Sequence, residues 1–372
     1  MTGLGEVRDI TAMDCLGVPI FVGERRGAPS GAYSFGKGLL PIHSEVGAYM
    51  EGIETYFSEP GVAQIETRFG RPSELSGVRP DCDPILEFAP KFDRRAARER
   101  PILLARAQDL ESGDEGWIPA ELAFNPSPLE SDTQLFGSSG NGLASGNTVL
   151  EASVHALFEL IERDIWSIEF VRNRSVRLAY NGLPRYVNRI VDLANRNGLR
   201  LVIRSVPNDY DLPFFSAFIY DTTKIESCRF NGGWGCHQER EVALLRAVTE
   251  AAQSRVAVLG GWRETKHGDD TVVEAARVKR QIGAVSRTTP STKFGDIPDR
   301  PSLPSMPAQW SFALCRLRRV IDRPIYRLIY TPSEGPLHVV RLIVPLMEHF
   351  TRSTMRVGPR MLAELEALGR VV

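Results

Sequence analysis

The chain has 372 residues, enough for one large domain or two ordinary ones with a substantial core. Apolar residues make up 42% and charged residues 24%, as in an ordinary globular protein. The net charge of −1 gives no general attraction to nucleic acid or to an anionic membrane. With no apolar signal segment at the start and no run of the roughly 20 apolar residues that a spanning helix needs, we expect a cytoplasmic protein.

The five cysteines are scattered, and no two of them have the spacing of a zinc site. We therefore expect neither a metal framework nor disulfides. Cys236 is followed directly by His237, but adjacent residues in a strand point to opposite faces. A metal or nucleophile role for Cys236 is accordingly not predicted.

The N-terminal third carries one clear element. The first 40 residues indicate short strands and turns around the apolar run Val18–Val22. A helix is predicted over 43–58, because apolar side chains recur there at helical spacing. Residues 59–136 give weak signals apart from an apolar piece at Ile102–Ala105, and polar loops are expected.

The rest of the chain alternates long helical patterns with extended ones, which predicts an α+β (mixed α/β) sheet protein. The segment 286–309 is rich in Pro, Ser and Thr and is expected to be a loop or mobile flap. We expect a single domain over 1–372, with an N-terminal part to about 136, core motifs over 137–260 and a C-terminal part from 261. The expected elements are helices at 150–172, 184–197 and 239–259, and strands at 199–206, 214–220, 325–330 and 337–345.

Three of the predicted helices carry acidic or amide side chains on one face. Glu151, His155, Glu159 and Glu162 fall within an arc of about 80° on an ideal helix. Such a stripe is self-repelling unless a hard cation such as Mg²⁺ neutralises it. Two further sets have the same character: Glu51 with Glu54, and Arg246 with Glu250 and Gln253. The alternative, that these are solvated helix faces, stays open.

Glycine-rich segments precede each of these helices. Glycine lets backbone N–H groups approach a phosphate, and a helix N-terminus favours an anion there. Neither a P-loop nor a Rossmann motif is present, so each segment alone indicates a turn. The repeated order of glycine segment and acidic helix indicates a phosphate site. The segments are Phe35–Gly38, Gly137–Gly142, Ser145–Thr148 and Gly232–Gly235.

Two long motifs closely resemble the YcaO family. One is Asn141–Thr148 followed by Glu151 and Glu159–Asp164, and the other is Glu241–Arg255. Three shorter segments resemble the same family, and together the motifs span most of the chain. The shorter segments are Gly36–Gly38, Met50–Glu54 and Val344–Glu348.

The resemblance implies that ATP and Mg²⁺ are held by Glu-lined helices without a P-loop. Carried over by motif, the nucleotide contacts are Lys37, Asn147, Arg163, Gln253 and Arg255. The residues that would serve Mg²⁺ are Glu51, Glu54, Glu151, Glu159 and Glu162. The helical faces agree with this assignment except for Arg255, which lies opposite Arg246 on an ideal helix. No catalytic residue is assigned.

Three positions depart from the family pattern. Gly47 and Ala144 stand where relatives have Ser, and Thr55 stands where they have Arg. These changes affect the assignment of individual ligands and not the expectation of the whole site. His155 is expected to be a packed or supporting residue and not a catalytic base.

The resemblance implies ATP-dependent O-phosphorylation of a backbone amide in a ribosomally made peptide or protein. The nucleophile then sets the product: a Cys, Ser or Thr side chain gives an azoline, sulfide a thioamide and an amine an amidine. Azoline-forming relatives commonly end in a P-x-P-x-P tail, which this sequence lacks. We therefore favour thioamide formation, with sulfur from a separate TfuA-like partner.

Two alternatives stay open. One is an azoline-forming cyclodehydratase, and the other is a non-catalytic ATP-binding accessory protein of the ribosomal-protein S12 methylthiotransferase accessory type. Retention of the acidic ligands favours an enzyme, since a scaffold has no need of a self-repelling Glu cluster. Analogy alone suggests a homodimer.

Overall fold

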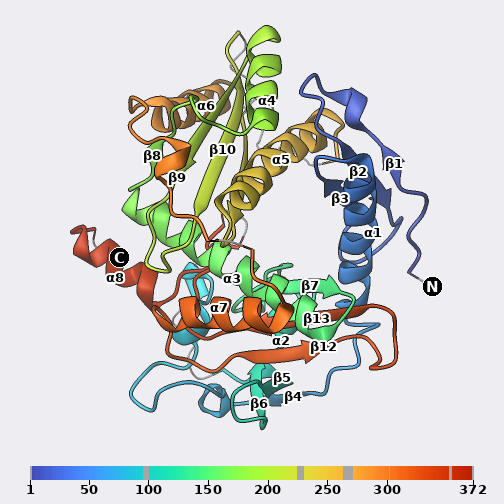
Figure 1. Ribbon diagram of the computed structural model, residues 1–372. Coiled ribbons are helices and arrows are strands. Elements are labelled where there is room, and N and C mark those ends of the chain that lie inside the picture. Colours follow the sequence, from blue (N-terminus) through green and yellow to red (C-terminus); the bar gives the residue numbers. More distant parts are fainter. Residues whose placement is uncertain are drawn as a thin grey trace. The chain divides into compact units, whose positions relative to one another are not determined.

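The computed structural model describes residues 2–94, 100–223, 230–262, 271–300, 302–351 and 354–370 (Figure 1). Its mixture of helices and antiparallel sheets confirms the predicted mixed α/β class. The chain divides into two compact units. Unit 1 comprises Met1–Gly27, Gly31–Gly52 and Arg174–Ser302, and unit 2 comprises Ala28–Ser30, Ile53–Asn173 and Leu303–Val372. Each unit combines segments far apart in sequence, so its borders differ from the expected parts.

Unit 1 contains two antiparallel sheets. The three-stranded sheet has the order β1-β2-β3, and the four-stranded sheet has the order β11-β10-β9-β8. The strands of the first are β1 (Arg8–Asp9), β2 (Ile20–Glu24) and β3 (Tyr33–Lys37). Those of the second are β8 (Val176–Arg177), β9 (Leu199–Ser205), β10 (Phe214–Asp221) and β11 (Phe230–Cys236).

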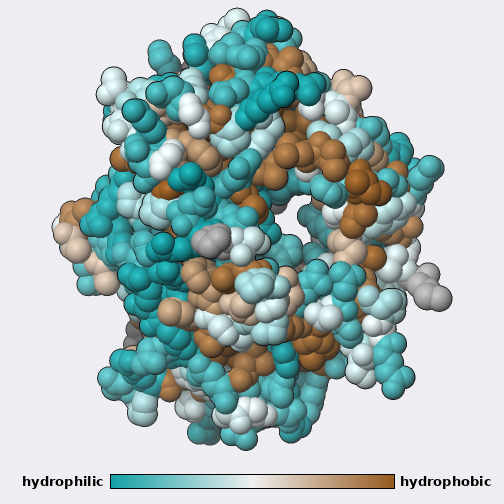
Figure 2. All heavy atoms as spheres, in the orientation of Figure 1, coloured by the Kyte–Doolittle hydropathy of each residue, from teal (hydrophilic) through white to brown (hydrophobic). Residues whose placement is uncertain are grey.

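The central strand β10 is buried over its whole length, which explains its continuous apolar sequence. Phe215, Ala217 and Ile219 join a core formed with helices α4 (Arg185–Arg196) and α5 (Arg240–Leu259). Phe218 and Tyr220 point to the opposite face, which α6 (Thr271–Ser286) covers. Helices thus flank both faces of this sheet (Figure 1), and hydrophilic residues cover the outside of α4 (Figure 2).

The glycine segment before α5 is not a phosphate-binding turn, contrary to the sequence prediction. Gly233 and Gly235 lie inside strand β11, against α5. A Cβ at Gly235 would lie 2.1 Å from the carbonyl oxygen of Ala243, and one at Gly233 would lie 2.4 Å from that of Ala247. These glycines are needed because the helix backbone lies directly on the strand.

The expected loop or flap at 286–309 is irregular over most of its length, and part of it packs into unit 1. Phe294 and Ile297 are buried in the core of unit 1. Arg240 anchors the segment by donating Nη1 to the carbonyl oxygens of Gly295 and Ile297, each at 3.0 Å. Its Pro, Ser and Thr content goes with irregular backbone, and helix α7 begins near its end, at Met306.

Unit 2 is built on a six-stranded antiparallel sheet with the order β4-β5-β12-β13-β7, in which β6 also pairs with β5. Its helices are α2 (Ala120–Ala123), α3 (Val149–Arg172), α7 (Met306–Arg318) and α8 (Pro359–Ala367), and α1 (Pro41–Phe57) enters it from unit 1. Its strands are β4 (Thr67–Gly70), β5 (Ile102–Asp109), β6 (Glu115–Pro119), β7 (Leu143–Gly146), β12 (Tyr326–Ile329) and β13 (His338–Ile343).

Helix α3 packs on β7 and β13, and α7 and α8 pack on α3 (Figure 1). The hydroxyl of Thr148 caps its start by accepting the backbone N–H of Glu151, and Asn173 ends it in a left-handed conformation with φ 51°. Of its 24 residues, 15 are buried. The helix is therefore central to unit 2 and has little surface left for polar side chains.

We predict that Gly235→Ala lowers the free energy of unfolding by about 3 kcal/mol, because its methyl group would push α5 off β11. Urea unfolding would measure this. The control is Gly283→Ala in α6, where no heavy atom lies within 4 Å of the added Cβ. That variant should gain up to about 1 kcal/mol from helix propensity. Equal stability of the two variants would contradict the packing account.

Candidate nucleotide and magnesium site

The residues predicted for ATP and Mg²⁺ are divided between the two units. Unit 1 holds Lys37, Glu51, Gln253 and Arg255. Unit 2 holds Glu54, Asn147, Glu151, Glu159, Glu162 and Arg163.

In unit 1, the strand end of β3 brings Lys37 to helix α5. The ammonium Nζ of Lys37 lies 3.8 Å from Glu250 Oε2, and both side chains are mostly buried. Gln253, one turn along α5 from Glu250, is 6% exposed. Glu51 accepts the backbone N–H of Phe35, which ties helix α1 to β3. The spacing places Arg246, Glu250 and Gln253 on one face of α5, and the structure adds Lys37, from the end of β3, beside Glu250.

Close packing of β3 on α1 also explains one departure from the family pattern. A Cβ at Gly36 would lie 1.7 Å from the carbonyl oxygen of Ser44, so only glycine fits there. On the helix side, a Cβ at Gly47 would lie 3.3 Å from the Gly36 Cα. Gly47 therefore allows the strand that ends in Lys37 to approach the helix that carries Glu51 more closely than Ser would.

Arg255 occupies a different environment from the Lys37 group. Its Nε donates to Asp14 Oδ1 at 3.0 Å, and both side chains are almost fully buried. Arg246, on the other side of α5, donates Nη1 to the carbonyl oxygen of Cys236 at 3.4 Å. Among the described residues, Arg255 Nη1 has no hydrogen-bond partner. That N–H group is the one Arg255 could offer to a ligand.

In unit 2, Glu54 and Glu151 are held by hydrogen bonds beside strand β7. The hydroxyl of Ser145, on β7, donates to Glu54 Oε1 at 2.5 Å. Asn147 donates its backbone N–H to Glu151 Oε2 at 2.9 Å and its side-chain amide to the same oxygen at 3.1 Å. The loop between β7 and α3 therefore holds Asn147 against Glu151, while their roles toward the nucleotide and Mg²⁺ stay predictions.

The remaining three residues lie along α3. Glu162 is 6% exposed, and Arg163 Nη2 lies 3.9 Å from Glu162 Oε1. Glu159 is half-buried, whereas His155 on the same stripe is exposed. His155 is therefore not packed in the core, and a supporting role for it stays a prediction.

The donor set suits Mg²⁺, which prefers carboxylate oxygen ligands. Glu54, Glu151, Glu159 and Glu162 all lie on or beside α3, and Glu162 is a carboxylate taken largely out of water. Within the described ranges of the chain, no group of three or more acidic, His or Cys side chains is by itself close enough to hold a metal ion. The assignment of individual ligands accordingly stays a prediction.

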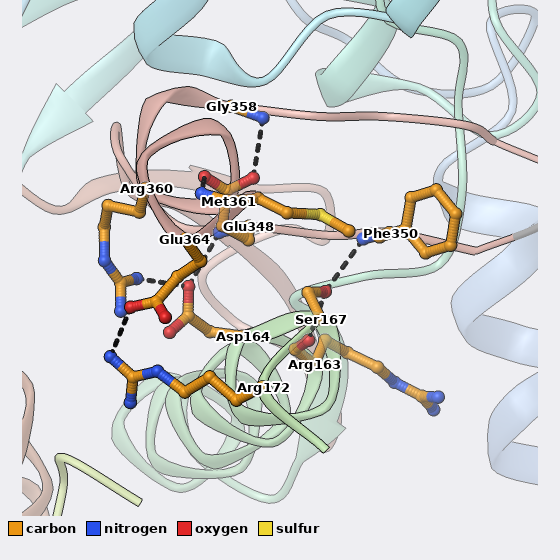
Figure 3. Close-up of polar contacts among 10 residues, drawn as sticks. All are labelled: Arg163, Asp164, Ser167, Arg172, Glu348, Phe350, Gly358, Arg360, Met361 and Glu364. Atoms are coloured by element: carbon orange, nitrogen blue, oxygen red, sulfur yellow. Dashed lines mark hydrogen bonds and ion pairs between the residues drawn. The ribbon is translucent and has the colours of Figure 1, made fainter. Parts of the chain in front are cut away.

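A second cluster, of buried charged side chains, lies beside α3 in unit 2 (Figure 3). No functional role for these residues was predicted from the sequence. Asp164, fully buried, accepts the backbone N–H of Glu348 at 2.7 Å and Arg360 Nη1 at 2.6 Å. Glu348 in turn accepts the backbone N–H groups of Gly358 at 2.7 Å and Met361 at 2.9 Å, at the start of α8. The cluster thus fastens α8 to α3.

Two more contacts extend this attachment along α3. Ser167 accepts the backbone N–H of Phe350 at 2.8 Å, and Arg172 donates to Glu364 at 2.6 Å. Arg163, next to Asp164 in sequence, points away from the cluster (Figure 3). In the sequence, the only signal for this cluster was that Asp164 and Glu348 are the last residues of two family motifs. That the two residues meet could be seen only in the structure.

Burial gives Glu348 an unusual titration. Burial and the nearby Asp164 raise the pKa of this carboxyl while the two N–H donors and Arg360 lower it, and the net result is a rise from 4.5 to about 7. His237 shows the opposite effect, since burial and Arg246 lower its pKa to about 4. His237 is therefore neutral near pH 7.

A family model described as YcaO cyclodehydratase, ATP- and Mg²⁺-binding, matches residues 35–348. An uncharacterised protein of Methanothermobacter thermautotrophicus is 30% identical over 367 residues, which cover 97% of this chain and 94% of that protein. An uncharacterised protein in the tfuA 3′ region of Rhizobium leguminosarum bv. trifolii is 30% identical over 275 residues. That match covers 70% of this chain and 64%, less than two thirds, of the rhizobial protein.

Two solved structures share the fold. YcaO from Methanopyrus kandleri, bound with AMPPCP and Mg²⁺, has a TM-score of 0.74 at 22% identity, covering 96% of this chain and 89% of that one. A heterocyclase in complex with substrate and cofactor has a TM-score of 0.76 at 19% identity. The match covers 99% of this chain and 53% of the heterocyclase, so this chain spans about half of that protein. In the described residues, no helix is long and apolar enough to cross a membrane.

We predict that Glu348 makes the stability of the protein depend on pH. Because its folded pKa is about 7 and its ordinary value is 4.5, the folded state keeps a proton that the unfolded state releases between these values. Its contribution is complete below about pH 4.5 and is lost by about pH 7, a change of about 3 kcal/mol. Glu348→Gln should remove this slope from urea-unfolding measurements.

The control is Glu366→Gln, at an exposed position on α8, which should keep the slope of the wild-type protein. An unchanged slope in Glu348→Gln would show that the titration belongs to other groups.

Proposed function

The chain belongs to the YcaO family, whose members bind ATP and Mg²⁺, and from this we propose that it is an ATP-dependent enzyme that activates a backbone amide of a peptide or protein. The observation that carries the proposal is the retention of both long motifs together with the ordered side chains they supply. Lys37 is held beside Glu250, and Asn147 is held on Glu151. A protein that only presented a substrate would not need to preserve these charged groups.

We assign the binding roles residue by residue. Lys37, Asn147, Arg163, Gln253 and Arg255 would contact the nucleotide. Glu51, Glu54, Glu151, Glu159 and Glu162 would hold Mg²⁺. ATP with Mg²⁺ would supply the phosphoryl group that is transferred to the amide oxygen.

The chain's own residues contribute position and charge. The contact with Glu250 limits where the Lys37 ammonium can move, so its charge is available at a fixed place. Arg163 adds a second cation from α3, and the burial of Glu162 strengthens the field around it. Stabilising the negative charge that develops during phosphoryl transfer is the main task of a protein in such reactions.

We further propose that the product is a thioamide. The relative found in a tfuA 3′ region supports this branch, since it places a similar protein beside tfuA. In the reaction, hydrosulfide forms the new C–S bond, the C–O bond breaks, and the amide oxygen leaves as inorganic phosphate with ADP as the second product. A TfuA-like protein would be the partner that supplies the sulfur.

Azoline formation is the second candidate, and the cyclodehydratase description of the family favours it. Mass spectrometry separates the two. A candidate peptide incubated with the protein, ATP, Mg²⁺, sulfide and a TfuA-like protein should gain about 16 Da for the exchange of oxygen for sulfur. A loss of about 18 Da would instead identify an azoline. If no peptide shows either mass change and ATP is not hydrolysed with any of them, the enzyme proposal is overturned.

We predict that Glu162→Gln lowers peptide-dependent ATP turnover at least about 100-fold, because the amide removes a ligand charge while keeping its shape. Calorimetry should show the same variant losing Mg²⁺-dependent ATP binding. Glu366→Gln, also in unit 2 but exposed on α8, is the matched control and should behave as wild type. If Glu162→Gln bound ATP and Mg²⁺ as tightly as wild type, the metal assignment would be wrong.

A further inference from the structure

Unit 2 contains a small cavity whose polar lining plays no part in the proposed nucleotide contacts. The cavity measures about 30 Å³, which is room for about two water-sized groups. Its apolar lining includes Leu160 of α3 and Met347. Its polar lining consists of Ser139, Asn141, Arg341 and Arg356.

Arg341 is the most buried of these groups. It lies on strand β13, opposite Leu143 of β7, and is 1% exposed. Its Nη1 donates to the carbonyl oxygen of Leu122 at 2.7 Å. Within the described part of the chain, its Nε and Nη2 have no hydrogen-bond partner. Three N–H bonds of a buried cation are thus left for a ligand in the cavity.

Arg356 adds a second buried guanidinium. It is 6% exposed and donates to the carbonyl oxygens of Ala89 and Phe88, each at 2.8 Å. Burial and, to a smaller extent, the charge of Arg341 lower its pKa while Glu348 and Glu121 raise it, and the net result is a pKa of about 10. No described carboxylate lies within 4.0 Å of either guanidinium, so neither has a direct counter-ion there.

The nearest carboxylates are engaged elsewhere. Glu121 accepts the backbone N–H groups of Leu135, Phe136 and Gly137 at 2.7–3.0 Å. Glu348 accepts those of Gly358 and Met361. These acids reduce the net charge of the region but leave the free N–H groups of Arg341 unsatisfied.

His349 adds a neutral imidazole to the region. Its Nδ1 lies 3.4 Å from the hydroxyl of Ser139, a cavity residue. Burial lowers its pKa well below 6.5, and the charges of Arg356, Arg163 and Arg341 lower it further. The same charges that keep this histidine neutral would attract an anion.

The energetics favour an anion over water in this cavity. A buried guanidinium with unsatisfied donors costs several kcal/mol, and water would satisfy the hydrogen bonds without neutralising the charge. Charge-assisted bonds from Arg to an anion are about twice as strong as neutral ones. The room for about two water-sized groups suits a small anion.

We propose that the cavity lined by Arg341 and Arg356 binds a small monovalent anion, and that its occupant is hydrosulfide, held near α3 for attack on the activated amide. The choice of hydrosulfide rests on the proposed thioamide-forming function. The anion site itself rests on the free N–H groups of a buried arginine and on the size of the cavity.

Diffraction tests the site without relying on activity. Crystals of the full chain soaked in sodium bromide should give an anomalous peak beside Arg341 Nη2, and added sodium hydrosulfide should reduce that peak. A cavity that holds only water, or a bromide ion that hydrosulfide fails to displace, would overturn the proposal.

Kinetics tests the role of the anion. Arg341→Met keeps an unbranched apolar stem but removes the guanidinium and its charge, so the KM for hydrosulfide should rise about 10- to 100-fold while the KM for ATP stays unchanged. Arg341→Lys should restore part of the effect. The control is Arg106→Met, which removes an exposed arginine of β5.

An equal rise in both KM values, or no rise in the KM for hydrosulfide, would count against the site. If no thioamide forms with wild-type protein, the proposed function fails, and bromide binding still decides whether the anion site exists.

Discussion

The packing of helix α3 on strands β7 and β13 is the constraint on which unit 2 depends. With 15 of its 24 residues buried, α3 is surrounded on most sides, and its acidic stripe runs from the half-buried Glu151 and Glu159 to the buried Glu162. The start of the helix is fixed by Thr148, and the loop before it holds Asn147 on Glu151. One helix thereby sets the directions of Glu151, Glu159 and Glu162.

Unit 1 reaches a similar result by a different contact. Helix α5 lies so close to β11 that the strand requires glycine at two positions. That approach leaves the face with Glu250 and Gln253 turned toward the end of β3, where Lys37 is placed. In both units a helix lying closely on a sheet gives charged side chains fixed positions, which suits phosphoryl-transfer chemistry.

Unit 2 also contains several buried charged side chains. Asp164 and Glu348 are taken out of water and satisfied by backbone N–H groups and Arg360. Glu87 and Arg323 form a buried pair with two hydrogen bonds, at 2.6 and 2.8 Å. Arg341 differs from these groups because part of its guanidinium has no such compensation among the described residues. That contrast is the reason to expect a ligand beside it.

The sequence by itself determined the family and most of the long elements. Apolar periodicity predicted α1, α3, α4 and α5 to within a few residues, because each helix has one face set by the core. The strands β9, β10, β12 and β13 were predicted equally well from their apolar runs. The two long motifs identified the YcaO family, which the family match over residues 35–348 confirms, together with ATP and Mg²⁺ as its cofactors.

Tertiary structure decided the rest. The glycines of β11 look like a turn in sequence, and only the backbone of α5 explains why they lie in a strand. The hairpin of β5 and β6 and the short helix α8 have weak periodicity, since long-range pairing and buried charges stabilise them. The meeting of Asp164 with Glu348, and the burial of Arg341 in a cavity, join residues some 180 positions apart. No local pattern encodes such contacts, because their energy comes from groups that only the fold brings together.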